Sequence, residues 1–158
     1  MNEENITLRE MLAGEETKVC GLVQEVFDRF VAPQFSQQGI DEFRDYVRAE
    51  ALERRADEGH VILLAVEGDS LLGMIEMRHG NHISLLFVCE AHQGEGIGRE
   101  LVARALQRCG DVADGGEPIT VHASPNSVGF YRKAGFLPQG PERIEHGIRY
   151  IPMRLDRS

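Results

Sequence analysis

Apolar and polar residues alternate with recognisable periods along the chain, and their order predicts the N-terminal part of the fold. Residues 4–12 alternate with the two-residue period of a strand. Residues 14–31 repeat apolar side chains at helical spacing, and Pro33 ends this predicted helix. A second helix is predicted over residues 39–59, with Asp41 as its N-cap and a glycine at its C-terminal end.

The rest of the chain predicts a sheet flanked by helices. Further strands are predicted over residues 60–68, 71–80, 82–88, 115–124 and 148–155, and further helices over residues 99–110 and 127–136. Hairpins dominate the middle, and helices alternate with strands later, so the sequence predicts an α/β fold with one mixed sheet and helices on both faces. Because 42% of the residues are hydrophobic and 27% are charged, we expect a single globular domain over residues 1–158.

Charge and cysteine content narrow the partners and the compartment. The formal net charge is −9 and lysine and arginine form no cluster, which argues against a nucleic-acid partner. The three cysteines are an odd number without a CxxC pair, and no signal-like segment precedes them, so we expect free thiols in a reducing cytoplasm. The longest apolar run, residues 61–66, is far shorter than the about 20 residues of a membrane span, so no membrane association is expected.

Gly94, Gly96 and Gly98 stand within five positions between a predicted strand and a predicted helix. Ordering glycine is costly, and the unpaired N–H groups at a helix start bind anions, so this loop predicts a phosphate site. The alternative is a flexible loop with a glycine-rich helix cap. A dinucleotide-binding fingerprint is excluded because Arg99 stands where its third glycine belongs. A P-loop is excluded because no lysine followed by serine or threonine comes after the last glycine.

A second motif follows the glycine loop after about thirty residues. The loop has the pattern QxxGxG from Gln93 to Gly98, and residues 126–136 are "NSVGFYRKAGF". Together these motifs resemble the GNAT superfamily of N-acyltransferases over roughly residues 60–155, and residues 1–59 suit its variable N-terminal part. The resemblance implies a GNAT-like domain whose central mixed sheet has about six to seven strands. It also implies that this sheet splays between its fourth and fifth strands.

The resemblance implies acetyl-CoA as co-substrate and assigns residues to it. It places the pyrophosphate on the loop and the following helix start, at Gln93, Gly94, Glu95, Gly96, Ile97, Gly98 and Arg99. Asn126 would hydrogen-bond the pantetheine arm, and its alternative is a turn residue after Pro125. Phe87 and Val88 would lie at a bulge where the sheet splays, so that their unpaired backbone groups pair with pantetheine amides.

Attack of a neutral amine on a thioester needs a base for the ammonium and an acid for the departing thiolate. The resemblance assigns the acid to Tyr131, whose alternative role is core packing beside Phe130 and Phe136. It points to His82 as the base, because His82 matches the position of the strand-four glutamate that some family members use. Histidine titrates near neutral pH and could accept the proton directly or through water, although His82 also suits an exposed position beside a turn. Glu76 is the alternative base, in an apolar segment that would bury it unless alternation points it at solvent. Family members without a dedicated base deprotonate the amine through ordered water.

Other reactive side chains have simpler interpretations. Cys89 lies beside the expected thioester and near His92, but a small buried hydrophobe is favoured over a nucleophile. The six histidines include no helical HxxxH pair, so no metal is expected.

The predicted activity is therefore transfer of the acetyl group of acetyl-CoA to a primary amine of an unidentified small molecule, by direct attack in a ternary complex. The alternatives are a protein or peptide N-acetyltransferase and a non-catalytic acyl-CoA binding module. The acceptor site would be shaped by the first two helices, their connection over residues 31–40 and the hairpin over residues 141–153, with Glu142, Glu145 and His146 at its mouth. Members of the superfamily often dimerise, so a homodimer is the assembly that the resemblance suggests.

Overall fold

The computed structural model of the protein describes residues 5–78, 80–109 and 117–156. Its strands are β1 (Ile6–Glu10), β2 (Val61–Glu67), β3 (Ser70–Arg78), β4 (His82–Val88), β5 (Ile119–Ala123), β6 (Leu137–Pro138), β7 (Arg143–Glu145) and β8 (Ile148–Leu155). Its α-helices are α1 (Glu16–Phe30), α2 (Gln37–Tyr46), α3 (Ala49–Asp57), α4 (Ile97–Cys109) and α5 (Val128–Lys133). Among the described residues, short 3-10 helices are η2 (Ala32–Gln34), η3 (Glu90–His92) and η4 (Pro125–Ser127).

The predicted mixed sheet is confirmed, with more strands than expected. The strands follow the order β1-β2-β3-β4-β5-β8-β6, and β7 pairs with β8, so the described residues form an eight-stranded sheet. The two additional strands are β6 and β7, which have two and three residues and are too short to produce a periodic pattern. The predicted element ends that fall on residues 110–116 lie outside the described residues.

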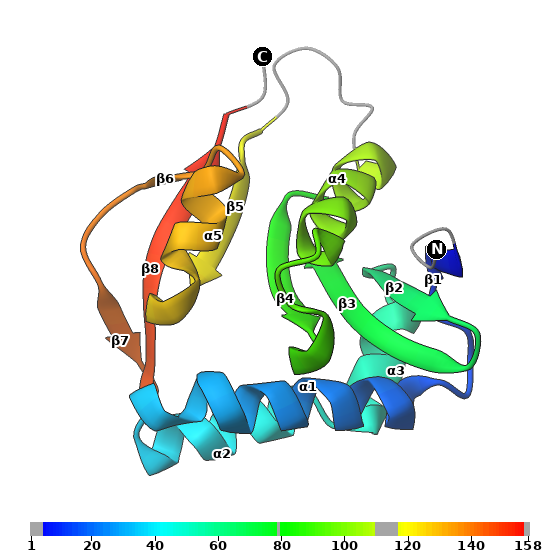
Figure 1. The fold of residues 1–158 in the computed structure, drawn as a ribbon. Helices are drawn as coiled ribbons and strands as arrows, with labels where there is room; N and C mark the ends of the chain where they lie inside the picture. Colours follow the sequence, from blue (N-terminus) through cyan, green and yellow to red (C-terminus); the bar gives the residue numbers. More distant parts are fainter. Residues whose placement is uncertain (1–4, 79, 110–116, 157–158) are drawn as a thin grey trace.

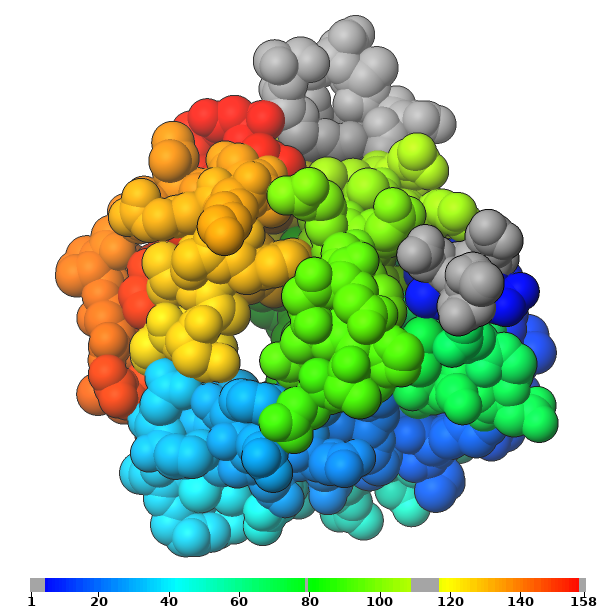
Figure 2. All heavy atoms as spheres, viewed as in Figure 1, coloured from blue at the N-terminus to red at the C-terminus, as the bar shows by residue number. Residues whose placement is uncertain are grey.

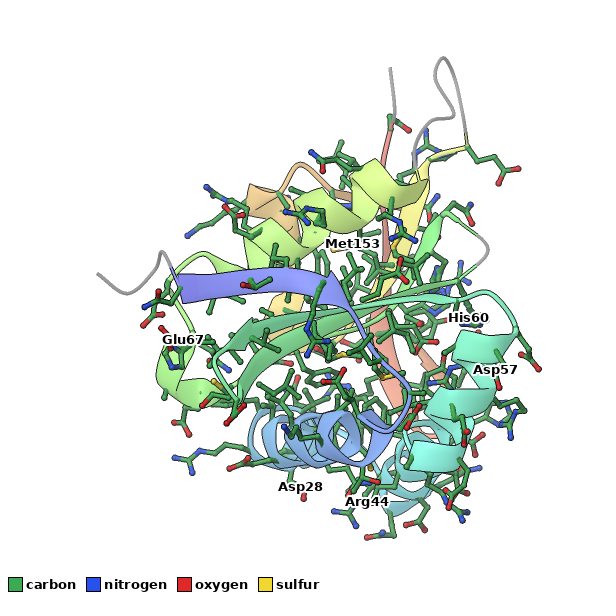
Figure 3. The ribbon with its side chains drawn as sticks, turned by 90° about the vertical axis from the view of Figure 1, so that its right-hand side faces the viewer. Asp28, Arg44, Asp57, His60, Glu67 and Met153 are labelled. Atoms are coloured by element: carbon green, nitrogen blue, oxygen red, sulfur yellow. The ribbon has the colours of Figure 1, made fainter. Side chains whose placement is uncertain are left out.

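Helices cover both faces of the sheet, as predicted (Figure 3). Alternate side chains of β3 point to opposite faces, because the side-chain period of a strand is two residues. Ile75 belongs to the core beneath α4, together with Leu101. Met74 belongs to the core beneath α1 and α3, together with Val23 and Leu52.

The prediction of one helix over residues 39–59 is wrong, because two helices, α2 and α3, occupy this segment. Ser36, and not Asp41, caps α2: its hydroxyl accepts a hydrogen bond of 3.2 Å from the backbone N–H of Gly39. The chain turns at Arg48, whose backbone is extended (φ −63°, ψ 151°). Val47 is fully buried beside this turn, so the break is made by tertiary packing that a continuous apolar period does not reveal.

Strands β4 and β5 pair in parallel only at their first residues, which confirms the predicted splay. The pairs are His82 with Thr120 and Ile83 with Val121. Beyond them the sheet divides into two arms, and Figure 1 shows β1–β4 with α4 in one arm and β5, β8 and α5 in the other. Both arms rest on α1 and α2, which cross beneath the division.

The predicted bulge lies at a different place from the one expected. Strand β4 carries one extra residue at Ser84, because Leu85 pairs with Glu76 whereas Ile83 pairs with Met77. The Ser84 hydroxyl donates a hydrogen bond of 3.4 Å to the carbonyl oxygen of Glu76. Phe87 and Val88 stay in register with β3 and are not bulged, so their prediction as bulge residues is wrong. Their edge towards β5 nevertheless lies beyond the last β4–β5 pair.

Helix α2 is fixed against the turn between β7 and β8. A Cβ atom added to Gly39 would lie 2.2 Å from the carbonyl oxygen of Gly147, so the two backbones touch. The turn itself uses His146 (φ 55°) and Gly147 (φ 82°) in the left-handed region. The start of α2 therefore packs against the β7–β8 turn.

Candidate active site

A cleft of about 1040 Å³ passes through the division between β4 and β5. Figure 2 shows its opening between α1 and the residues after it (blue), the glycine-rich loop (green) and the η4–α5 segment (yellow). Of its lining, we call residues 88, 92–99, 124, 126, 127, 130, 131 and 133 the loop side. We call the lining residues of α1 and α2, with residues 31, 35, 78, 82–87, 121–123, 145, 146 and 148–150, the helix side.

The three loop glycines serve two different purposes. Gly94 (φ 85°) and Gly96 (φ 91°) lie in the left-handed region, where other residues are strained. Nothing lies within 4 Å of a Cβ atom built at either position, so their backbone conformation, and not crowding, requires glycine. At Gly98 the added Cβ atom would lie 3.2 Å from the Phe130 ring, so this glycine allows α4 to approach α5 closely.

Helix α4 begins at Ile97 beside the cleft, and its first backbone hydrogen bond runs from Glu100 N–H to the carbonyl oxygen of Gly96. The N–H groups of Ile97, Gly98 and Arg99 precede this bond and have no partner inside the helix. These groups and the helix dipole favour an anion at this position, as the sequence predicts.

The polar side chains of the loop are used to hold it in place. The amide of Gln93 donates a hydrogen bond of 3.0 Å to the carbonyl oxygen of Val88, which ties the loop to the end of β4. Glu95 lies 2.9 Å from Nδ1 of His92 and is turned towards it. Arg99 is exposed on the first turn of α4, where its guanidinium borders the cleft.

Asn126 borders the cleft from η4 and connects its two sides. Its Oδ1 accepts hydrogen bonds from Nε2 of Gln34, at 3.1 Å, and from the hydroxyl of Ser124, at 2.8 Å. Gln34 also donates to the carbonyl oxygen of Phe30, at 2.8 Å. Among the described residues the Nδ2 group of Asn126 has no hydrogen-bond partner, so its N–H donors are available to a ligand.

Tyr131 of α5 is packed in the hydrophobic core and also borders the cleft. It is 5% exposed, and its ring meets those of Phe130 and Phe136 edge to face at 5.1 and 5.4 Å. Burial raises the pKa of its hydroxyl far above its ordinary value. Core packing and the predicted acid role are therefore compatible, because burial keeps the hydroxyl protonated while its position borders the cleft.

Two imidazoles line the helix side next to the division of the sheet. His82 lies on β4, with its Nδ1 2.8 Å from the hydroxyl of Thr120. His122 lies on β5, and its ring meets that of His82 edge to face at 4.9 Å and stacks on Tyr150 at 4.1 Å. Burial and the charge of Arg78 lower the pKa of His122, which favours the neutral imidazole that can accept a proton.

His122 was missed in the sequence, although a signal was present. Side chains of β5 alternate between the two faces of the sheet, and Ile119, Val121 and Ala123 are buried on the α4 face. His122 lies between the last two and therefore points to the other face. Since β5 pairs with β4 at His82, that position had to lie near the predicted base.

Glu76 does not line the cleft, so its prediction as a catalytic base is wrong. It is fully buried on the α3 face, where Arg55 donates two hydrogen bonds, of 2.7 and 3.0 Å, to its carboxylate. Nδ1 of His60 lies 2.8 Å from the same carboxylate. Because side chains alternate between the two faces of β3, Glu76 points away from the cleft and towards Arg55. Each side chain of this buried pair provides the opposite charge that the other needs.

Cys89 lies outside the cleft lining, and the described histidines are not grouped as metal ligands. Cys89 is not among the lining residues of the cleft, and burial raises the pKa of its thiol, which disfavours the nucleophilic thiolate. Within the described ranges, His, Cys, Asp and Glu side chains form no group of three or more with metal-binding geometry. Every described helix is also too short or too polar to cross a bilayer.

Aromatic side chains of α1 and α2 form much of the helix side. Phe27 and Phe43 stack at 4.0 Å, with ring planes 11° apart. Phe35 meets Phe27 edge to face at 5.5 Å, and Phe87 of β4 lies 5.8 Å from Phe43. The helical period predicts Phe27 as a core position, but it does not reveal that the cluster continues into the cleft.

A mixed sheet divided between the parallel strands β4 and β5, with the unpaired N–H groups of a helix start beside the division, suits a ligand that carries phosphate groups. The profile of the acetyltransferase (GNAT) domain matches residues 31–157, and the chain belongs to this family. It is thus an acyltransferase of the acetyl-CoA-dependent N-acetyltransferase class, with acetyl-CoA as co-substrate.

Solved structures share this fold over almost the whole chain. A GCN5-related N-acetyltransferase from Rhodopseudomonas palustris superposes with a TM-score of 0.81 at 18% identity, covering 96% of this chain and 95% of that chain. The PaiA N-acetyltransferase from Thermoplasma acidophilum, in complex with coenzyme A, gives 0.79 at 16% identity and covers 96% and 99%.

A chimera of the spermidine N-acetyltransferase SpeG from Vibrio cholerae and hSSAT gives a TM-score of 0.63 at 20% identity, covering 96% of this chain and 95% of that chain. At these identities the likeness concerns the fold alone. No curated protein sequence matches the chain.

Proposed function

We propose that the protein transfers the acetyl group of acetyl-CoA to the primary amine of a small molecule by direct attack in a ternary complex. The observation that carries the proposal is one continuous cleft with an anion site and Tyr131 on its loop side and two imidazoles and an aromatic wall on its helix side. Both substrates can therefore occupy the cleft together, so no covalent acetyl-enzyme is needed.

The loop side supplies groups for each part of coenzyme A. The N–H groups of Ile97, Gly98 and Arg99 receive the pyrophosphate. The unpaired edge of β4 at Phe87 and Val88 offers backbone groups to the pantetheine amides, although the Val88 carbonyl is already used by Gln93. The Nδ2 group of Asn126 donates to a pantetheine carbonyl. All are proposals for the sites that the resemblance assigns to acetyl-CoA.

The reaction needs one proton removed and one supplied. The amine nitrogen bonds to the acetyl carbon, and its proton passes to the imidazole of His122 or His82, directly or through water. The carbon–sulfur bond breaks, and the departing thiolate takes a proton from the hydroxyl of Tyr131. The directions of the pKa shifts favour the starting protonation states that these roles need, because a lowered pKa keeps His122 neutral and a raised pKa keeps Tyr131 protonated.

The closed helix side favours a small acceptor over a protein or peptide acceptor. Gly39 and Gly147 are in backbone contact across its end, and Arg149 donates a hydrogen bond of 3.5 Å to the carbonyl oxygen of Gln34. A peptide would need an open groove at this end.

Steady-state release of the CoA thiol with a panel of primary amines tests the proposal, and spermidine belongs in the panel because it is the acceptor named for the similar SpeG. We expect turnover with at least one amine, and initial-velocity lines that intersect when both substrates are varied. Tight acetyl-CoA binding without turnover across the panel would support the non-catalytic binding module. Parallel lines would indicate an acetyl-enzyme and contradict direct attack.

A further inference from the structure

The helix side of the cleft presents a half-buried aromatic surface. Phe35, Phe43 and Phe87 line the cleft, and each keeps part of its surface exposed there. Phe27 is fully buried behind them and stacks on Phe43 at 4.0 Å, so the surface has a rigid support. Exposed apolar area of this kind inside a cleft marks a place where a ligand buries an apolar group.

Acidic groups are few on this side, although the whole chain carries a net charge of −9. Among the described residues, the carboxylates that line the helix side are Glu42 and Glu145. Burial foremost, and then the neighbouring carboxylate of Glu145, raise the pKa of the Tyr150 phenol, while Arg143 opposes this shift.

Two cationic side chains belong to the same wall. Arg78 and Arg149 line the same side, and Arg149 is paired with Glu142 at 2.7 Å. The charge of Arg78 is felt at His122, whose pKa it helps to lower. A ligand with several ammonium groups needs several carboxylates along its length, and this wall does not supply them.

We infer that the acceptor is a primary amine with one ring-sized apolar group, which packs on Phe35, Phe43 and Phe87, and that it is not a polyamine. The inference rests on the proposed function, because it names the substrate class of the same site. The same cleft is lined by His82 and His122 on β4 and β5, so an aromatic or branched apolar group stacked on this surface would leave the amine nitrogen to extend towards these imidazoles.

Competing amines provide the test. Acetylation is measured as CoA thiol release with 2-phenylethylamine and with spermidine at matched concentrations. We expect kcat/KM for 2-phenylethylamine to exceed that for spermidine by about tenfold or more, because only the former buries a ring. Equal values, or a preference for spermidine, would overturn the inference while leaving the proposed acetyltransferase intact. Acetyl-CoA binding without turnover of any amine would instead remove the proposed function itself.

Substitution of Phe43 tests the surface directly. We expect Phe43→Ala to lower kcat/KM for 2-phenylethylamine by about tenfold or more, with the dissociation constant of acetyl-CoA unchanged, and Phe43→Leu to restore most of it. Ile144→Ala is the matched control, because Ile144 is an exposed apolar residue on β7 that does not line the cleft. Full activity of Phe43→Ala would contradict the inference. If Phe43→Ala does not fold, Phe43→Leu decides alone: we expect an altered ranking among apolar amines, and an unchanged ranking would contradict the inference.

Discussion

Position 96 requires glycine because of its backbone conformation alone. Its φ of 91° matches the 98° of Gly59 at the end of α3, and an added Cβ atom meets nothing within 4 Å at either position. Alanine at both positions should therefore cost the same stability, about 1 kcal/mol. Only Gly96→Ala should also weaken coenzyme A binding, by about tenfold, because it turns N–H groups away from the pyrophosphate.

Calorimetric titration with coenzyme A and thermal unfolding of the two variants measure these effects. Gly59→Ala is the control for strain alone. Equal coenzyme A affinities for the two variants would contradict the role of the loop.

His122 makes the activity depend on pH in a defined direction. Its pKa lies below the ordinary 6.5, and only the neutral imidazole accepts a proton. As the pH falls through the lowered pKa of His122, kcat/KM should fall. Between that pKa and neutral pH, kcat/KM should be constant. Ionisation of Tyr131 should not limit the rate below pH 10, because its pKa is raised above that ordinary value.

Profiles of kcat/KM against pH for the native protein, His122→Gln and His82→Gln assign the acid limb. We expect the limb to disappear in His122→Gln and to remain in His82→Gln. The reverse result would assign the base to His82, and a midpoint above pH 6.5 would contradict the environment described for His122.

Segment η2 orients Asn126 across the cleft through Gln34. The Nε2 group of Gln34 donates a hydrogen bond to Oδ1 of Asn126, so the Nδ2 donors of Asn126 are left for pantetheine. We expect Gln34→Ala to raise the dissociation constant of coenzyme A by about three- to tenfold, the effect of one hydrogen bond.

The variant Gln34→Glu sharpens this test. Its carboxylate accepts from Nδ2 and reverses the Asn126 amide, so the loss should be larger than for Gln34→Ala. Gln24→Ala is the control, because Gln24 lies on α1 outside the cleft lining and donates only to Cys20. Equal affinities for the two Gln34 variants would exclude an orienting role.

Elements could be predicted from the sequence where one local period decides them. The apolar stripe of α1 and the strands β2, β3 and β4 follow from such periods. The turn at Arg48 and the extra residue at Ser84 could not, because they are set by contacts between distant segments. Arg55 reaches Glu76 only after that turn, and no periodic signal carries this ion pair.

At the scale of the molecule, the N-terminal helices join the two arms of the divided sheet (Figure 1). Glycine spacing and the "NSVGFYRKAGF" motif predict the loop side, because short motifs carry its chemistry. The helix side is assembled from α1, α2, β4, β5 and β8, so its aromatic wall and His122 become neighbours only in the folded chain. The donor substrate is therefore readable from the sequence, and the acceptor site requires the structure.

Tyr131 is proposed to supply a proton during acetyl transfer inside this cleft. Tyr131→Phe removes one hydroxyl and keeps the ring that packs on Phe130 and Phe136. The decisive measurement is kcat of thiol release, together with the coenzyme A dissociation constant, for the native protein and Tyr131→Phe. We predict a fall in kcat of about a hundredfold or more with an almost unchanged dissociation constant. An unchanged kcat in a folded Tyr131→Phe would contradict the account.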